Sequence, residues 1–200
     1  MTGERPRGRP RLERTNDAIV AATLEILVEV GFAGLTIEGV AGRAGVSRPT
    51  VYRRAASKEA LVVDALDASV PIIVPDTDGA TLTEITRTVR RTIDDLGTSA
   101  MGGATVAVLA ASAANPTLAS MLRERYLAPR LGAIMDMVEA GTRSGSVRAD
   151  LSPALVRDLL IGPLVYRWLV SGAPMSGHEA AQLSSAITDV LRPRESGSGR

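Results

Sequence analysis

The sequence of 200 residues contains no cysteine and only one histidine, His178. Without cysteine the chain has no disulfide bond and no thiolate chemistry, and a single histidine leaves too few soft ligands for a typical zinc site. We therefore expect no bound metal and no other cofactor. Aromatic residues are also scarce, with one Phe and one Trp, which argues against a ligand cavity walled by aromatic rings.

Long apolar runs and recognisable catalytic motifs are missing as well. No apolar run approaches the roughly 20 residues that a helix needs to cross a bilayer, and the basic N-terminus lacks the apolar core of a signal peptide. With 45% hydrophobic and 22% charged residues, the composition is that of a soluble globular protein, which we expect in the cytoplasm. The chain shows no Ser-His-Asp spacing, no phosphate-binding glycine loop and no set of metal ligands, so we do not expect an enzyme.

Strand patterns are too short and too charged to be convincing, whereas apolar residues recur at helical spacing along the chain. The sequence therefore predicts an all-α fold of about nine helices. Pro71 and Pro75 end the fourth helix and mark a domain boundary. The predicted parts are a disordered basic arm at 1–12, a first helical domain at 13–72, a second at 81–192 and a flexible tail at 193–200.

Helix ends are marked by caps and glycines. Gly31 predicts a stop for a first helix that starts near residue 13. Thr81 with Glu84, and Ser176 with Glu179, form the spacing of capping boxes and predict two helix starts in the second domain.

Positive charge is concentrated in the first part of the chain. Residues 1–60 hold ten basic and seven acidic side chains, a net of +3, whereas residues 61–200 have a net of −2. Five basic residues lie between positions 41 and 58, among them Lys58, which is the only lysine. A polyanion partner such as DNA would therefore meet the first domain.

Residues 36–58 show the pattern of two short helices joined by a tight turn. Thr36 is expected to cap a helix to about Ala44, Gly45 supplies the turn, and Ser47 caps the next helix, where a proline in the first turn is tolerated. This arrangement is a helix-turn-helix, whose second helix can lie in the major groove of DNA. Because any two capped helices would show similar caps, the outward residues decide between a structural and a DNA-binding interpretation.

Those outward residues favour DNA. Arg48 is placed for a bidentate contact to guanine, and Pro49 or Thr50 for contact with a thymine methyl group. Tyr52, Arg53 and Lys58 are placed to reach phosphates. Thr36 and Ser47 head their helices, where free amides favour a phosphate, although either residue would also serve as a cap alone.

The string VGFAGLTIEGVAGRAGVSRPTVYRRAASKEAL resembles the N-terminal domain of TetR-family transcriptional regulators, over residues 13–66. The resemblance includes a helical run ending in Gly-Phe, a T-I-x-x-V-A helix start, and A-G-V-S-x-x-T-V-Y-R before S-K-E-A-L. It implies a three-helix DNA-binding domain with DNA-facing residues at the matching positions. Together with two further candidates, Arg43 and Arg53, the predicted set is Thr36, Arg43, Ser47, Arg48, Pro49, Thr50, Tyr52, Arg53 and Lys58.

One departure from the family pattern lies just after the second helix of this motif. The family usually has a large aromatic residue and often a proline there, whereas this chain has Ala55 and Ala56. A lost buried aromatic ring removes packing, so the domain is less rigid or another side chain fills the gap. Arg54 is a further candidate for a phosphate contact.

For residues 81–192 the resemblance implies an effector-binding and dimerisation domain, with a homodimer through the last two helices at about 153–171 and 177–191. A helix buried within one chain is the alternative for the apolar segment 153–171. The candidate ligand contacts, which are equally ordinary core residues, are Met101, Met121, Tyr126 and Trp168.

The sequence thus predicts a regulator that binds an operator in double-stranded DNA and is a repressor released by a small apolar ligand. The alternative is a helical carrier or scaffold for apolar molecules with a vestigial DNA-binding domain.

Overall fold

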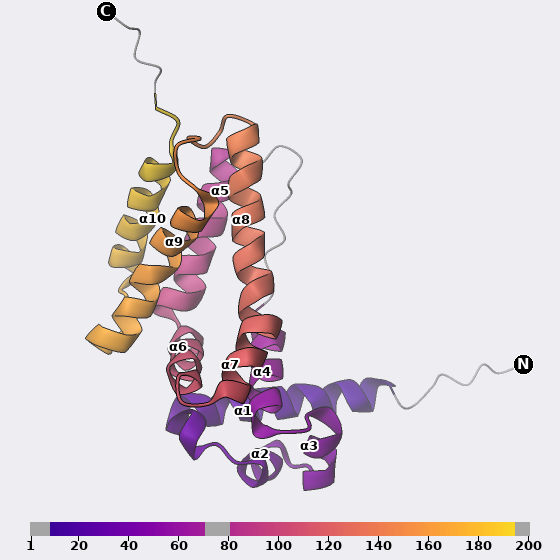
Figure 1. Ribbon diagram of the computed structural model, residues 1–200. Coiled ribbons are helices and arrows are strands. Elements are labelled where there is room, and N and C mark those ends of the chain that lie inside the picture. The colour runs from indigo at the N-terminus through magenta and orange to yellow at the C-terminus, as the bar shows by residue number, and fades with distance from the viewer. Residues whose placement is uncertain (1–8, 71–80, 195–200) are drawn as a thin grey trace, which may run out of the picture. The chain divides into compact units, whose positions relative to one another are not determined.

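The computed structural model describes residues 9–70 and 81–194, and in these ranges every regular element is a helix (Figure 1). The helices are α1 (Arg9–Gly34), α2 (Ile37–Ala44), α3 (Arg48–Arg54), α4 (Lys58–Ser69), α5 (Leu82–Ile93), α6 (Ala100–Ser112), α7 (Pro116–Met121), α8 (Ala128–Arg143), α9 (Pro153–Tyr166) and α10 (Gly177–Leu191). Three π-helical segments, η1 (Asp94–Thr98), η2 (Leu122–Leu127) and η3 (Arg167–Ser171), extend α5, join α7 to α8 and extend α9. None of the helices in the described ranges is long and apolar enough to span a membrane.

When each π-helical segment is counted with the helices that it extends or joins, the described residues form nine helices, as the sequence predicts. The all-α class is confirmed. The first helix begins at Arg9, whereas the sequence predicted a disordered arm up to residue 12. The rest of that predicted arm and most of the predicted tail lie outside the described residues. Gly31 interrupts α1 as expected, because its φ of 68° and ψ of −177° are not helical.

The chain forms two compact units. One comprises residues 1–71 and 107–125, and the other residues 72–106 and 126–200. The segment 107–125 was expected in the second domain but packs with the N-terminal helices. Buried Leu118 and Leu122 belong to this segment, and sequence periodicity alone does not show which neighbour covers an apolar stripe.

Polar contacts between α4 and the region of α7 add to this packing. Nδ2 of Asn115 donates to Oε1 of Glu59 at 3.0 Å, while Oδ1 of Asn115 caps α7 by accepting from the amide of Leu118. Arg125 forms an ion pair with Asp64 of α4. The segment that connects to the second unit is therefore fastened to the last helix of the first domain.

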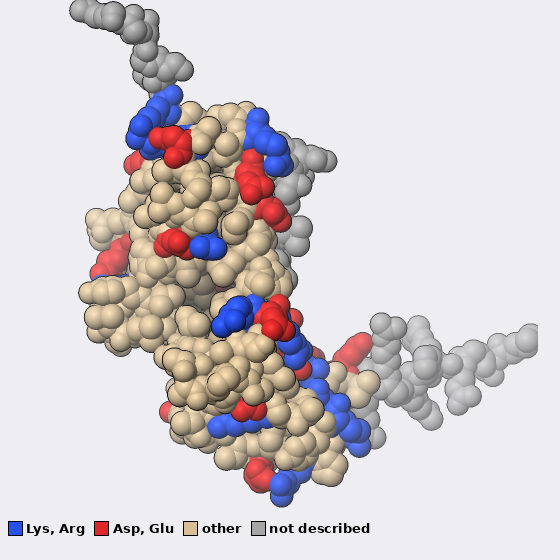
Figure 2. Space-filling model, viewed as in Figure 1, with Lys and Arg blue, Asp and Glu red and all other residues tan. Residues whose placement is uncertain are grey.

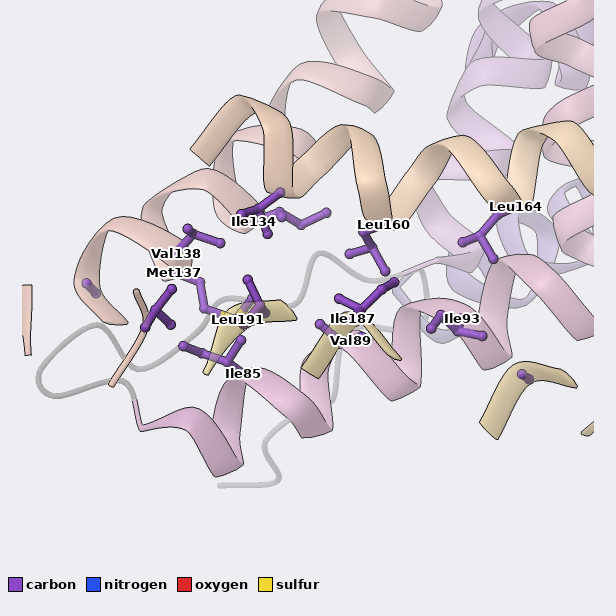
Figure 3. Packing of buried hydrophobic residues seen from close by; sticks show 14 of the residues in the cluster. Ile85, Val89, Ile93, Ile134, Met137, Val138, Leu160, Leu164, Ile187 and Leu191 are labelled. Carbon is purple, nitrogen blue, oxygen red and sulfur yellow. The ribbon is translucent and has the colours of Figure 1, made fainter. Parts of the chain in front are cut away.

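The second unit has its own hydrophobic core, formed mainly by α5, α8, α9 and α10 (Figure 3). Ile85 and Ile93 of α5 and Leu160 and Leu164 of α9 are at most 1% exposed. Both predicted capping boxes are present, at Thr81 with Glu84 and at Ser176 with Glu179.

The junction between α5 and α6 is unusually tight. A Cβ atom on Gly102 would lie 2.0 Å from the carbonyl oxygen of Leu96, and one on Gly103 would lie 2.7 Å from the Trp168 ring. The indole Nε1 of Trp168 donates to the same Leu96 carbonyl at 2.7 Å. Two glycines are thus required where backbone and indole meet.

This junction predicts a stability difference between two glycine substitutions. Gly102→Ala should lower the free energy of unfolding by about 3 kcal/mol, because the new methyl group collides with backbone rather than with a movable side-chain end. Gly132→Ala, in the interior of α8 with no atom within 4 Å of the place that a Cβ would take, should raise it by about 0.5–1 kcal/mol. Chemical denaturation measures both, and equal stability of the two variants would contradict the tight junction.

Candidate nucleic-acid interface

Helices α2 and α3 form the predicted helix-turn-helix. The side chain of Thr36 caps α2 by accepting from the amide of Gly39 at 3.0 Å. Gly45 ends α2 in the left-handed region with φ 64°, a conformation that costs little only for glycine. The amide of Val46 then donates to the carbonyl of Ala41 at 3.0 Å, which closes the turn before α3 begins.

Helix α3 has one buried and one exposed face. Val51 and Ala55 are 0% and 4% exposed. The exposed residues recur at helical spacing and are Arg48, Pro49, Tyr52 and Arg53. This short helix therefore presents two guanidinium groups, a proline ring and a phenol to solvent. In Figure 2, basic side chains form a band on the visible face of the part that holds α1 to α4, with acidic side chains scattered beside them.

Ser47 occupies the position before α3, but the expected hydrogen bond from its side chain to the helix backbone is absent. Such a bond would go to the second or third amide of the helix. Pro49 has no amide hydrogen, and the amide of Thr50 already donates to the Ser47 carbonyl at 2.9 Å. The Ser47 hydroxyl instead shares a hydrogen bond with the Thr50 hydroxyl at 2.8 Å.

Arg43 is turned toward α1. Its Nη1 and Nη2 donate to the two carboxylate oxygens of Glu29 at 2.6 and 2.8 Å. These hydrogen bonds hold the pKa of the Glu29 carboxyl below its usual value. Arg43 thus links α1 to α2 through two of its five N–H donors, and its role as a DNA contact remains a prediction.

The other predicted basic residues also have partners within the domain. Arg48 forms an ion pair with Glu38 of α2. Arg53 donates from Nη2 to the Thr50 hydroxyl at 3.1 Å. Lys58, at the start of α4, donates to the Ala33 carbonyl at 3.3 Å and lies 4.3 Å from the ring centroid of Phe32. Arg48 and Arg53 are exposed, whereas Lys58 is half-buried.

The helix-turn-helix is completed without the large aromatic residue that the family usually has near position 55. Ala55 is buried, and its amide donates to the carbonyl of Val51 at 3.0 Å to end α3. Ala56 is exposed. The neighbouring Arg54 is half-buried and its Nε is shielded from solvent, so this side chain packs against the domain rather than extending into solvent.

A second exposed surface lies on the last two helices of the other unit, and we call it the α9 stripe. Its large apolar side chains recur at helical spacing and are exposed by 40% to 66%. They are Leu155, Leu159, Tyr166, Leu169 and Val170. On α10, Val190 is 39% exposed. The sequence predicted that this apolar segment would pair in a homodimer, with burial within one chain as the alternative, and in the single chain one face of it is in solvent.

The four candidate ligand contacts have different surroundings. Tyr126 is 2% exposed, and Arg130 stacks on its ring at 4.0 Å from the centroid. Trp168 is half-buried against Gly103. Met101 and Met121 are half-buried, and Met121 belongs to the unit formed with the N-terminal helices. The candidates thus belong to two units and are not shown to line one site.

A hollow in the second unit, between the end of α8 and the start of α9, has charged side chains among its lining residues. Glu139, Arg143 and Asp150 contribute charged side chains. The pKa of Asp150 is lowered to about 2, because Arg148 donates hydrogen bonds to its carboxylate. Burial of an apolar ligand here would desolvate these charges, so the hollow does not fit the expected effector.

Within the described ranges, no group of three or more His, Asp or Glu side chains is placed so that it could hold a metal ion. Glu38, which lies beside the predicted DNA contact Arg48, was not identified from the sequence. The pattern that could have identified it is an acidic residue in the first turn of α2, next to the start of α3.

Two family models together match most of the chain. The model described as bacterial regulatory proteins of the tetR family matches residues 19–65, and the model of the tetracyclin repressor-like C-terminal domain matches residues 74–187.

Relatives and solved structures agree with this assignment. The HTH-type transcriptional regulator YdeS of Bacillus subtilis is 33% identical over 168 residues, which cover 83% of this chain and 84% of YdeS. The DNA-binding transcriptional repressor TetR of Mycobacteroides abscessus is 27% identical, covering 90% and 94% of the two chains. FadR of Bacillus subtilis, solved in complex with stearoyl-CoA, shares the fold with a TM-score of 0.69 at 19% identity, covering 88% and 97% of the two chains.

Helix-turn-helix geometry, a basic and exposed second helix, and both family models therefore lead to one assignment. The function is not enzymatic, because the family consists of regulators. The chain belongs to the TetR family and is a DNA-binding transcriptional regulator.

Proposed function

We propose that this regulator is a homodimeric repressor in the cytoplasm, which binds its operator through α3 and leaves it when a small apolar ligand binds the C-terminal domain. The observation that carries the proposal is the exposed face of α3, which sets Arg48, Pro49, Tyr52 and Arg53 on one side of a helix anchored by Val51. A carrier of apolar molecules whose DNA-binding domain no longer binds DNA would not need this exposed face on α3.

In this proposal the first turn of α3 lies in the major groove. Arg48 donates to O6 and N7 of a guanine, and Pro49 and Thr50 contact a thymine methyl group. Tyr52 and Arg53 lie one turn further along, where a hydroxyl and a guanidinium group reach phosphates.

Residues around the helix ends would fix the position of α3 on the duplex. The amides at the start of α2, next to Thr36, suit a phosphate because the positive end of the helix dipole lies there, and the Ser47 hydroxyl before α3 would donate to a second phosphate. Lys58 uses one of its three N–H donors on Ala33, which leaves two for a phosphate.

Dimerisation would bury the α9 stripe. Apolar side chains at helical spacing on the surface of one chain mark an interaction face, and a two-fold axis lets the same stripe meet its own copy. Two copies of α3 would then contact half-sites about one turn of DNA apart. This interface corresponds to the two helices that the sequence predicted to pair, α9 and α10.

The ligand class is proposed from the chain and from one relative of known structure. Met101 is a flexible side chain that suits loosely matched apolar ligands. Tyr126 and Trp168 would add apolar surface with a polar edge. FadR of Bacillus subtilis was solved with stearoyl-CoA, and we propose a long-chain acyl compound as the first effector class to test.

The chain itself offers a route from ligand to DNA. Helix α6 continues from the second unit into the first at residue 107, and η2 returns to the second unit after Arg125. Between these points Asn115 and Arg125 bind Glu59 and Asp64 of α4. A ligand that shifts α6 or α8 would therefore displace α4, and with it the spacing of the two α3 helices. Coupling of about 1–3 kcal/mol is enough to change operator affinity 5- to 150-fold.

Stearoyl-CoA and acetyl-CoA give a matched pair of ligands for testing release, because they share the polar head and differ in chain length. We expect stearoyl-CoA, but not acetyl-CoA, to change the fluorescence of Trp168 and to release labelled operator DNA from the protein. Trp168 is the only tryptophan, so its fluorescence reports binding directly. An apolar compound that saturates this signal while operator affinity stays constant would contradict release by ligand.

A further inference from the structure

Glu38 is an acidic residue on the surface proposed to face DNA. It lies in the first turn of α2, and 55% of its side chain is exposed. Its carboxylate forms an ion pair with Nη2 of Arg48, the first residue of α3, whose side chain is 58% exposed. The pair therefore joins the two helices of the motif on their solvent side.

Stability does not account for this carboxylate. Exposed ion pairs add little to the free energy of folding, Thr36 already caps α2, and the motif is held together by Val40 and Val51, both 0% exposed. An acidic side chain that faces a polyanion also weakens binding to DNA of any sequence. Glu38 is therefore placed where it lowers the affinity for DNA of every sequence.

We propose that Glu38 positions Arg48 and thereby narrows the set of base pairs that α3 accepts. The inference rests on the proposed function of Arg48 as a base contact. A guanidinium group carries five N–H donors in a rigid plane. When Glu38 holds Nη2, the remaining donors form a fork with one orientation, whereas a free arginine would adapt to several acceptors along the groove.

The carboxylate adds a second effect next to the Arg48 contact. Guanine and thymine present the acceptors O6 and O4 in the major groove, whereas cytosine presents an N4 amino donor and adenine an N6 amino donor beside its N7 acceptor. A carboxylate repels O6, O4 and N7 and accepts from an amino group, so cytosine is the one base that offers it a donor with no neighbouring acceptor. Glu38 thus favours cytosine on the strand that it faces, beside the guanine bound by Arg48.

Glu29 provides a matched control for the loss of one negative charge. It is 54% exposed, it pairs with Arg43, and it lies on α1 rather than on the exposed side of the turn. Glu29→Gln and Glu38→Gln each remove one carboxylate charge with almost no change in shape. Any general electrostatic gain in DNA affinity is therefore common to both variants.

A duplex library with about 20 randomised base pairs, long enough for two half-sites one turn apart, serves as the probe. The full-length protein and the variants Glu38→Gln, Glu29→Gln, Arg48→Ala and Glu38→Gln/Arg48→Ala each select from it, and the bound fractions are sequenced. We expect Glu38→Gln to reduce discrimination at the Arg48 base pair and its neighbour about fivefold or more. Glu29→Gln should strengthen binding to all sequences while base preferences stay the same.

The double variant separates the inference from the function on which it rests. If Arg48→Ala abolishes the preference at the Arg48 base pair and Glu38→Gln then changes the preference only at the neighbouring pair, Glu38 acts on the first pair through Arg48 as proposed. If Arg48→Ala abolishes the preference but Glu38→Gln behaves like Glu29→Gln, the positioning role is overturned and base contact by Arg48 stands. If Arg48→Ala leaves every preference intact, both the inference and the proposed base contact fail.

Discussion

Leu159→Glu is expected to convert the protein from a dimer to a monomer at micromolar concentration. Leu159 lies in the middle of the α9 stripe and is 40% exposed in the single chain. Burial of the exposed part of Leu159 would contribute about 1 kcal/mol, a glutamate in its place would add the cost of desolvating a charge, and a two-fold interface contains the residue twice. The variant would lose about 4 kcal/mol or more, which raises the dissociation constant of the dimer about a thousandfold.

Sedimentation velocity measures the change in association, and circular dichroism verifies that the helices persist. Operator affinity should fall in parallel, because a monomer offers one α3 helix to a site built for two. Val28→Glu is the matched control, since Val28 is a 50% exposed apolar residue on α1 outside the stripe. A Leu159→Glu protein that remains dimeric would show that the chains associate through another surface.

Arg48→Ala is expected to weaken operator binding at least about thirtyfold while it changes binding to scrambled DNA far less. A bidentate contact to guanine contributes about 1–3 kcal/mol of discrimination, and a dimer loses two such contacts. Arg48→Lys should not restore specificity, because an ammonium group lacks the planar fork.

Arg43→Ala is the control for a lost positive charge in the same motif. Because Arg43 is bonded to Glu29 of α1, its removal should shift affinity for operator and scrambled DNA by similar factors. Fluorescence anisotropy with both duplexes gives, for each variant, the ratio of its affinity for operator DNA to its affinity for scrambled DNA. A larger loss of specificity in Arg43→Ala than in Arg48→Ala would reverse the roles assigned to these arginines.

Local features made the first domain predictable from the sequence. Caps, glycine turns and helical spacing act within a few residues, so the cap at Thr36 and the turn at Gly45 were predicted correctly. The capping boxes at Thr81 and Ser176 were found for the same reason. The DNA-facing role of the exposed face of α3 remains a prediction.

Features that depend on distant residues were harder to predict. The partner of Arg43 is 14 positions away, on α1, and the packing of residues 107–125 with α4 joins segments about fifty residues apart in the sequence. The missing side-chain bond of Ser47 had a local cause, because Pro49 lacks an amide and the amide of Thr50 was already occupied. Combined effects of two neighbours were thus missed even where each residue was interpreted correctly.

The most direct test of sequence-specific binding compares two duplexes over a series of salt concentrations. One carries the DNA that flanks the gene of this protein, and the other has the same composition in scrambled order. We predict that the flanking DNA binds at least about a thousandfold tighter, with an affinity that falls steeply as salt rises. Equal and weak binding to both duplexes, together with a random-sequence selection that enriches no motif, would contradict recognition of an operator by α3.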